Sequence, residues 1–141
     1  MSKAGIDTNV LVMYFVAPTE ADNPETHAMH QLAVQLIDKQ LGPGLTGFVS
    51  TVVILELQHT LKRVFGARRA QLMAVLEALV QHPFIELEND KQVLAAMATA
   101  ASKNCGFQDC LLVETAALHG ATTTYTFDKQ AAKRAGMKLL A

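Results

Sequence analysis

The chain has 141 residues, and half of them are hydrophobic. This length and composition fit one compact domain, 1–141, that buries about two thirds of its unfolded surface, and they exclude a disordered or mainly polar protein. The 12 basic and 13 acidic residues give a net charge of −1, so a polyanionic partner has to be bound by a local group of residues.

Short apolar segments alternate with segments of helical periodicity along the chain. Asp7 or Thr8 can cap the first helix, and Ser50 or Thr51 can cap a later one. In chain order we predict a strand at 4–7, helices at 8–15 and from Thr26 to the Gly42-Pro43-Gly44 turn, a strand at 46–50, helices at 51–66 and 68–81, a strand at 84–87, helices at 91–103 and 109–119, a strand at 122–126, a helix at 128–136 and a last strand at 137–140.

The order of these elements predicts the fold class. Strands that alternate with helices are joined by right-handed crossovers, which make the strands parallel and place helices on both faces of the sheet. We therefore expect an α/β fold, a three-layer α/β/α sandwich around a central, mainly parallel sheet.

Two features bear on the compartment. No apolar run approaches the roughly 20 residues of a membrane span, and Asp7 stands where a leader peptide would be apolar. We therefore expect a cytoplasmic protein that does not contact a membrane. Cys105 and Cys110 match neither the common zinc spacing nor the redox spacing, and we expect both to be free thiols.

Four acidic residues are placed where parallel sheets bind their ligands, outside the carboxyl ends of the strands. Asp7 ends the first strand, Asp128 follows the strand at 122–126, Asp109 opens a helix and Glu56 lies in the helix after the strand at 46–50. Each Asp taken singly is more simply explained as a helix cap. Glu56 interrupts an apolar run, where an ionised carboxylate needs a partner.

A cluster of these acids would need cations. Two carboxylates about 4 Å apart repel by about 4 kcal/mol at an effective dielectric constant near 20. Oxygen ligands without Cys or His favour Mg²⁺ or Mn²⁺ over zinc. Such ions can activate water and stabilise an in-line displacement at phosphorus, so the acids indicate metal-assisted hydrolysis of a phosphodiester.

The chain resembles the PIN-domain nucleases, and especially the VapC-like toxin ribonucleases of type II toxin-antitoxin systems. The resemblance covers nearly the whole chain and depends on four segments in the right order and spacing. These are Gly5-Ile6-Asp7-Thr8-Asn9-Val10-Leu11, the segment 50–57 with Glu56-Leu57, Gly106-Phe107-Gln108-Asp109, and Thr124-Tyr125-Thr126-Phe127-Asp128.

The resemblance implies an endoribonuclease that binds Mg²⁺ or Mn²⁺ in a pocket of four acids, with Asp7 and Asp109 as direct ligands. Glu56 and Asp128 would complete the pocket and position water or a second ion. The resemblance further implies that Asn9 and Thr126 support this pocket. Some relatives carry another acid about one helical turn after the third, where this chain has Leu112 and Val113.

The positions of basic and apolar residues also predict partner surfaces. Lys129, Lys133 and Arg134 come directly after Asp128 and are candidate contacts for RNA phosphates. A toxin would have a cognate antitoxin protein, and we expect a homodimer. The helices 51–64 and 68–81 could form a clamp for both partners, unless their leucines Leu55, Leu57, Leu61, Leu72 and Leu76 form the core instead.

Three other functions compete with the toxin. An aspartyl-nucleophile phosphatase of the haloacid dehalogenase type would also begin with a strand ending at Asp7, but it needs a second Asp where this chain has Asn9. A binding module without catalysis would tolerate loss of the acids, and all four are present. A housekeeping nuclease that processes RNA has the same site, and gene context would distinguish it from a toxin.

Overall fold

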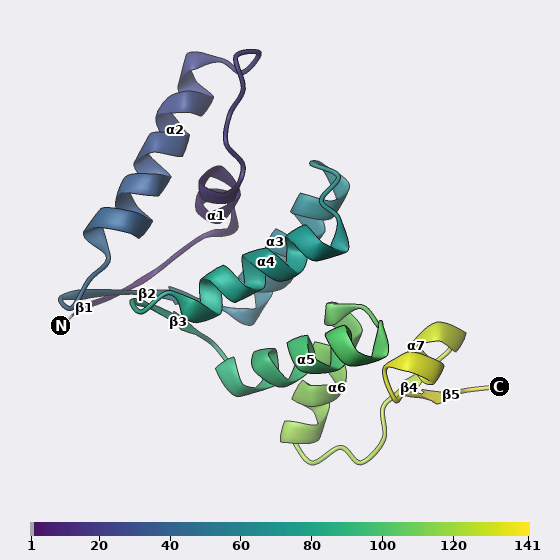
Figure 1. Cartoon of the computed structure of the whole chain (residues 1–141). Helices are drawn as coiled ribbons and strands as arrows, with labels where there is room; N and C mark the ends of the chain where they lie inside the picture. Colours follow the sequence, from purple (N-terminus) through teal and green to yellow (C-terminus); the bar gives the residue numbers. More distant parts are fainter. Residues whose placement is uncertain (1) are drawn as a thin grey trace. The chain divides into compact units, whose positions relative to one another are not determined.

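The computed structural model describes residues 2–141 (Figure 1). The chain divides into two compact units, the first ending at Glu88 and the second running from Asn89 to Ala141. Each unit contains helices and parallel strands. The prediction of an α/β fold with parallel strands is therefore confirmed within both units. No helix in the described part of the chain is long and apolar enough to cross a membrane.

A three-stranded parallel sheet organises the first unit. Its strands are β1 (Ser2–Gly5), β2 (Leu45–Val49) and β3 (Ile85–Leu87), in the order β1-β2-β3. Gly5 pairs with Phe48, and Val49 pairs with Leu87. All three strands run in the same direction, so their carboxyl ends lie at one edge of this sheet.

The helices of the first unit begin at local caps, as the sequence predicts. They are α1 (Thr8–Phe15), α2 (Pro24–Gln35) with the π-helical turn η1 (Leu36–Gln40), α3 (Thr51–Arg63) and α4 (Arg69–Gln81). Asp7 caps α1 and Ser50 caps α3. The prediction that α2 begins at Thr26 is wrong by two residues, because the Asn23 side chain accepts a hydrogen bond from the Thr26 amide (2.8 Å) and Pro24 takes the first helical position.

The core of the first unit is aliphatic. Its largest fully buried side chains are Leu11, Ile37, Val49, Ile54, Leu57, Leu76 and Leu79. Gly47 allows close packing in the middle of β2, because a Cβ there would lie 2.7 Å from Ile6 Cδ1. Leu57, Leu61 and Leu76 belong to this core, so the prediction that they contribute to a partner clamp is wrong for these three. Leu55 and Leu72 are half-buried.

The second unit contains α5 (Asp90–Lys103), α6 (Phe107–Leu118), β4 (Tyr125–Thr126), α7 (Lys129–Arg134) and β5 (Lys138–Leu139). α5 packs along α6, and β4 pairs with β5 in parallel. The strand predicted at 122–126 is shorter than expected, because only its last two residues pair with β5. The turn between α7 and β5 contains Gly136 at φ 77°, a conformation that favours glycine.

A disulfide joins Cys105 to Cys110. The prediction of free thiols is therefore wrong. Cys105 lies just before α6 and Cys110 in its first turn, so the local fold brings together two buried side chains whose spacing alone indicated no pairing. Gly106, the N-cap residue of α6, and Asp109 both lie in the short loop that this disulfide closes.

Candidate active site

Asp7 is held at the junction of β1 and α1. The Ile6 amide donates to the Phe48 carbonyl at 2.9 Å, which extends the pairing of β1 and β2 up to this junction. The Asp7 carboxylate is exposed, and its Oδ1 accepts a hydrogen bond from the Thr8 amide at 2.7 Å. The backbone of Asp7 is therefore fixed by the sheet, whereas its carboxylate faces solvent from the helix N-terminus.

Two polar neighbours of Asp7 lie in the first turn of α1. Asn9 is exposed. Thr8 is only 8% exposed, and its buried hydroxyl has no hydrogen-bond partner within residues 2–141. A buried hydroxyl without a partner costs free energy, so Thr8 provides an unused oxygen beside Asp7.

Glu56 lies on the solvent side of α3. The buried residues of this helix are Ile54, Leu57 and Leu61, and Glu56 is exposed. The expectation that Glu56 needs a partner inside an apolar environment is therefore wrong, because the helical period turns its side chain away from the core. α3 packs against α1, the helix that Asp7 caps.

Glu88 is a further acid at the carboxyl edge of the sheet, and sequence reasoning missed it. It follows β3 directly, and its amide donates to the Val49 carbonyl at 3.0 Å. Its Oε1 accepts a hydrogen bond from the Thr51 amide at 2.9 Å, at the N-terminus of α3. Its position in the sequence could have indicated this role. Glu88 comes directly after the predicted strand 84–87, just as Asp7 lies at the end of the first predicted strand.

Asp109 is the third residue of α6, not its first. Gly106 caps this helix, and the Cys110 amide donates to the Gly106 carbonyl at 3.1 Å. The prediction that Asp109 opens the helix is wrong by two residues. The half-buried Asp109 carboxylate lies above the cap, because a Cβ on Gly106 would be 3.9 Å from Asp109 Oδ2.

The environment of Asp109 leaves its carboxylate unused in the second unit. Within residues 2–141 this side chain makes no hydrogen bond and no ion pair. A helix N-terminus favours a negatively charged group, so Asp109 is in a suitable place for an anion without serving as the cap.

Asp128 caps α7 with its carboxylate. Oδ1 accepts hydrogen bonds from the amides of Gln130 (2.8 Å) and Ala131 (3.2 Å). The Asp128 amide in turn donates to the Thr126 hydroxyl at 3.0 Å. Thr126 therefore helps to orient Asp128, which the sequence predicts in the acidic pocket. The Oδ2 atom of Asp128 takes no part in these bonds.

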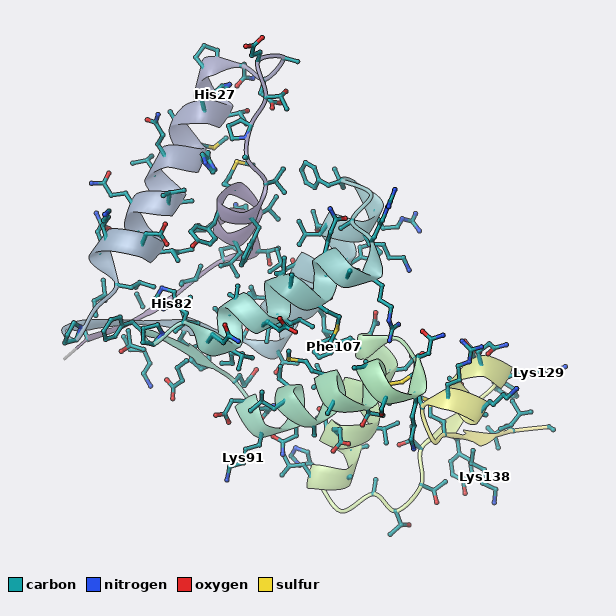
Figure 2. All side chains as sticks on the ribbon, in the orientation of Figure 1. His27, His82, Lys91, Phe107, Lys129 and Lys138 are labelled. Carbon is teal, nitrogen blue, oxygen red and sulfur yellow. A yellow bond between two sulfur atoms is a disulfide. The ribbon has the colours of Figure 1, made fainter. Side chains whose placement is uncertain are left out.

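The basic residues after Asp128 are exposed. Lys129, Lys133 and Arg134 all lie on α7, and Figure 2 shows Lys129 on this helix and Lys138 on β5. The Arg134 guanidinium donates to the Asn104 carbonyl at 3.4 Å. Within residues 2–141 the ammonium groups of Lys129 and Lys133 make no ion pair, and both lysines lie on the helix that Asp128 caps.

Within the described residues, three of the four histidines of the first unit, all except His59, make hydrogen bonds to the backbone. His30 Nδ1 lies 2.6 Å from the Met13 carbonyl and His27 Nε2 lies 2.9 Å from the Thr19 carbonyl. His82 accepts from the Phe84 amide through Nδ1 and donates through Nε2 to the Ile37 carbonyl at 3.0 Å. These hydrogen bonds account for the orientation of the three imidazole rings, and no metal ion is needed to explain it.

The four predicted acids are divided between the units. Asp7 and Glu56 belong to the first unit, and Asp109 and Asp128 belong to the second. Within residues 2–141, no three His, Cys, Asp or Glu side chains are grouped closely enough to hold a metal ion. The donor set itself, carboxylates with the oxygens of Thr8 and Asn9 beside Asp7, suits a hard divalent cation such as Mg²⁺ or Mn²⁺.

The comparisons with known proteins identify the family. The PIN domain profile matches residues 5–137, nearly the whole length, and the chain belongs to the PIN domain family. The match confirms the predicted fold class, an α/β fold with a parallel central sheet in the three-layer α/β/α arrangement. No curated protein matches the chain.

Family membership defines a class of function. PIN domains are typically nucleases, hydrolases that act on nucleic acid and generally use divalent metal ions. The chain therefore has a nuclease-type fold and a nuclease-type function.

Proposed function

We propose that this protein is an endoribonuclease that hydrolyses RNA phosphodiester bonds with Mg²⁺ or Mn²⁺, as the toxin of a toxin-antitoxin system. The observation that carries the proposal is the match to the PIN domain over residues 5–137 in a chain that has acids at all four expected positions. The environment of Asp109 supports it, because this carboxylate has no structural task within residues 2–141.

The acids would hold the metal as follows. Asp7 and Asp109 would be direct ligands, and Glu56 and Asp128 would complete the pocket. A bound divalent ion would supply charge stabilisation at the phosphate and lower the pKa of a bound water. Asn9 beside Asp7 and Thr126 beside Asp128 are supporting residues in this proposal, and the Thr126 hydroxyl already accepts from the Asp128 amide.

The chain's own residues orient the acids and bind the substrate. Capping bonds hold Asp7 and Asp128 at the N-termini of α1 and α7, so their carboxylates need little ordering before a ligand binds. Lys129, Lys133 and Arg134 would neutralise RNA phosphates next to Asp128. Phosphate contacts of this kind position the strand without reading its sequence.

The toxin role adds three expectations about partners and place. The protein would act in the cytoplasm, associate as a homodimer and be inhibited by a cognate antitoxin protein. Val52 on α3, and Val64 and Phe65 directly after this helix, are exposed apolar side chains that would contribute to such contacts. A housekeeping nuclease and a binding module without catalysis remain the competing functions.

The test is cleavage of total cellular RNA by the purified protein with Mg²⁺ or Mn²⁺, with EDTA, and with the Asp7→Asn variant. Asn caps helices about as well as Asp, so this change removes the charge and keeps α1 intact. We expect metal-dependent cleavage that falls at least about 100-fold in the variant.

The matched control is Asp22→Asn. Asp22 also accepts a hydrogen bond from a backbone amide, that of Thr19 at 2.8 Å, but it lies outside the predicted pocket. This variant should cleave like the wild type. Equal cleavage by wild type and Asp7→Asn at every metal concentration would contradict the proposal and favour a binding module.

The toxin role has a separate test. Induced expression in a bacterium should arrest growth, and the Asp7→Asn variant should not. Metal-dependent cleavage in vitro without growth arrest would identify a housekeeping nuclease.

A further inference from the structure

Two aromatic side chains are exposed immediately before Asp128. Tyr125 in β4 is 58% exposed and Phe127, the residue after β4, is 81% exposed. Alternate residues of an extended segment share one side, so these two rings lie on the side opposite Thr126, which is half-buried. Exposed apolar side chains that lie together, unlike ones scattered singly, mark interaction sites.

The surroundings of the two rings are strongly basic. The segment 125–141 contains four cations, Lys129, Lys133, Arg134 and Lys138, and its one acid is Asp128. Lys138 pairs with Tyr125 across the two-stranded sheet, and its ammonium group lies 6.0 Å from the centre of the Tyr125 ring. A partner for this surface therefore has to combine negative charge with flat apolar groups.

We infer that Phe127 is a stacking platform for an unpaired RNA base, with Tyr125 and Lys138 binding the neighbouring part of the strand. Aromatic rings beside cations are the combination that binds single-stranded nucleic acid, because every base has a π-face and every nucleotide has a phosphate. A protein partner would need acidic side chains placed to match the four cations, whereas in single-stranded RNA a phosphate accompanies every base.

The inference deepens the proposed nuclease function and depends on it. Phe127 precedes Asp128 in the chain, so the stacked base would belong to a nucleotide close to the phosphate that is cleaved. In a duplex the faces of the bases are covered by their neighbours. The new element is therefore the position of the stacked base, on Phe127 next to Asp128, and this position requires a base that is unpaired and free of its neighbours.

Binding of a fluorescein-labelled oligoribonucleotide to the full chain tests this inference, in EDTA so that no cleavage follows. We expect Phe127→Ala to weaken binding of the single strand by about 5- to 100-fold, the range for loss of one stacked base. The same oligonucleotide annealed to its complement should bind more weakly to the wild type and should not distinguish the variant.

A second variant reports stacking directly. The chain has no tryptophan, so Phe127→Trp introduces a single tryptophan at the platform, which can be excited selectively over the two tyrosines. This variant should keep the wild-type affinity, and RNA should quench its emission. The control is Leu32→Ala, since Leu32 is an exposed apolar residue of α2 in the first unit, outside the basic segment. Circular dichroism checks that every variant is folded.

Three results would overturn the inference. The first is equal affinity of Phe127→Ala and wild type for the single strand. In that case metal-dependent cleavage would still support the proposed function. The second is a loss of self-association in Phe127→Ala, measured by sedimentation, with no change in affinity for RNA. Phe127 would then be a protein contact. A wild type that neither binds nor cleaves RNA would remove the proposed function as well.

Discussion

The carboxylate of Glu88 accepts a hydrogen bond from the Thr51 amide at 2.9 Å, so the residue that follows β3 stabilises the N-terminus of the helix that follows β2. The bond links two neighbouring crossovers at the carboxyl edge of the sheet. It adds to the local cap of α3, in which the Ser50 hydroxyl accepts from the Val53 amide at 3.3 Å. A helix N-terminus favours this negative charge.

Replacing Glu88 should therefore destabilise the fold. We expect Glu88→Ala to lower the free energy of unfolding by about 1 kcal/mol, and Glu88→Gln to lower it less because the amide oxygen still accepts the bond. Denaturation by urea measures both. Glu77→Ala, which removes an exposed glutamate of α4, is the control. A change at Glu88 no larger than that at Glu77 would show that this cap is without energetic effect.

Asp128 allows capping to be separated from catalysis. Asp128→Asn should keep the bonds to the Gln130 and Ala131 amides and leave stability within a few tenths of a kcal/mol, whereas Asp128→Ala should cost about 1 kcal/mol. Both variants should lose RNA cleavage, because neither supplies a carboxylate. Thermal denaturation and the cleavage assay are measured on the same samples. Full cleavage by Asp128→Asn would restrict Asp128 to its structural role.

Tyr14 should make stability depend on alkaline pH. Its hydroxyl donates to Asp38 Oδ1 at 2.7 Å, between α1 and η1. Burial first, and then the hydrogen bond and the charge of Asp38, raise the pKa of Tyr14 from 10.0 to about 12. The native state therefore holds this proton more tightly than the unfolded state. The stabilisation is complete below pH 10 and is lost as the pH rises from 10 towards 12.

Comparison with Tyr14→Phe isolates this contribution. The variant should be less stable than the wild type by about 1 kcal/mol near neutral pH, and the difference should shrink above pH 10. Urea denaturation at a series of pH values measures it. Tyr125→Phe removes the other tyrosine and should leave the effect in place. If the free energies of unfolding of the wild type and Tyr14→Phe change in parallel with pH, the hydrogen bond from Tyr14 to Asp38 is not the source of the loss of stability at alkaline pH.

The disulfide between Cys105 and Cys110 should stabilise the second unit. It closes a short loop, because the two cysteines are 5 positions apart, and a loop of this size contributes about 2 kcal/mol in the chain-entropy model. Reductant should lower the stability of the wild type by that amount and should not affect the Cys105→Ser, Cys110→Ser double variant. Two free thiols in protein purified without reductant would contradict the bond.

The sequence by itself determined the features that depend on near neighbours. Asp7, Ser50 and Asp128 were recognisable as caps because each bonds to amides one to three residues ahead. The alternation of strands and helices predicted the parallel sheets for the same reason, since periodicity along the chain defines each element. The start of α6 was misplaced because its cap, Gly106, has no side chain to signal it.

Tertiary structure decided the features that depend on distant residues. Glu88 reaches Thr51 only because β2 and β3 pair, and these residues are 37 positions apart in sequence. Glu56 faces solvent because the core lies on the other side of α3, although its sequence neighbours are apolar. Local hydrogen bonds can be inferred from spacing, whereas the direction of burial depends on which surfaces the fold brings together, and that information is spread over the whole chain.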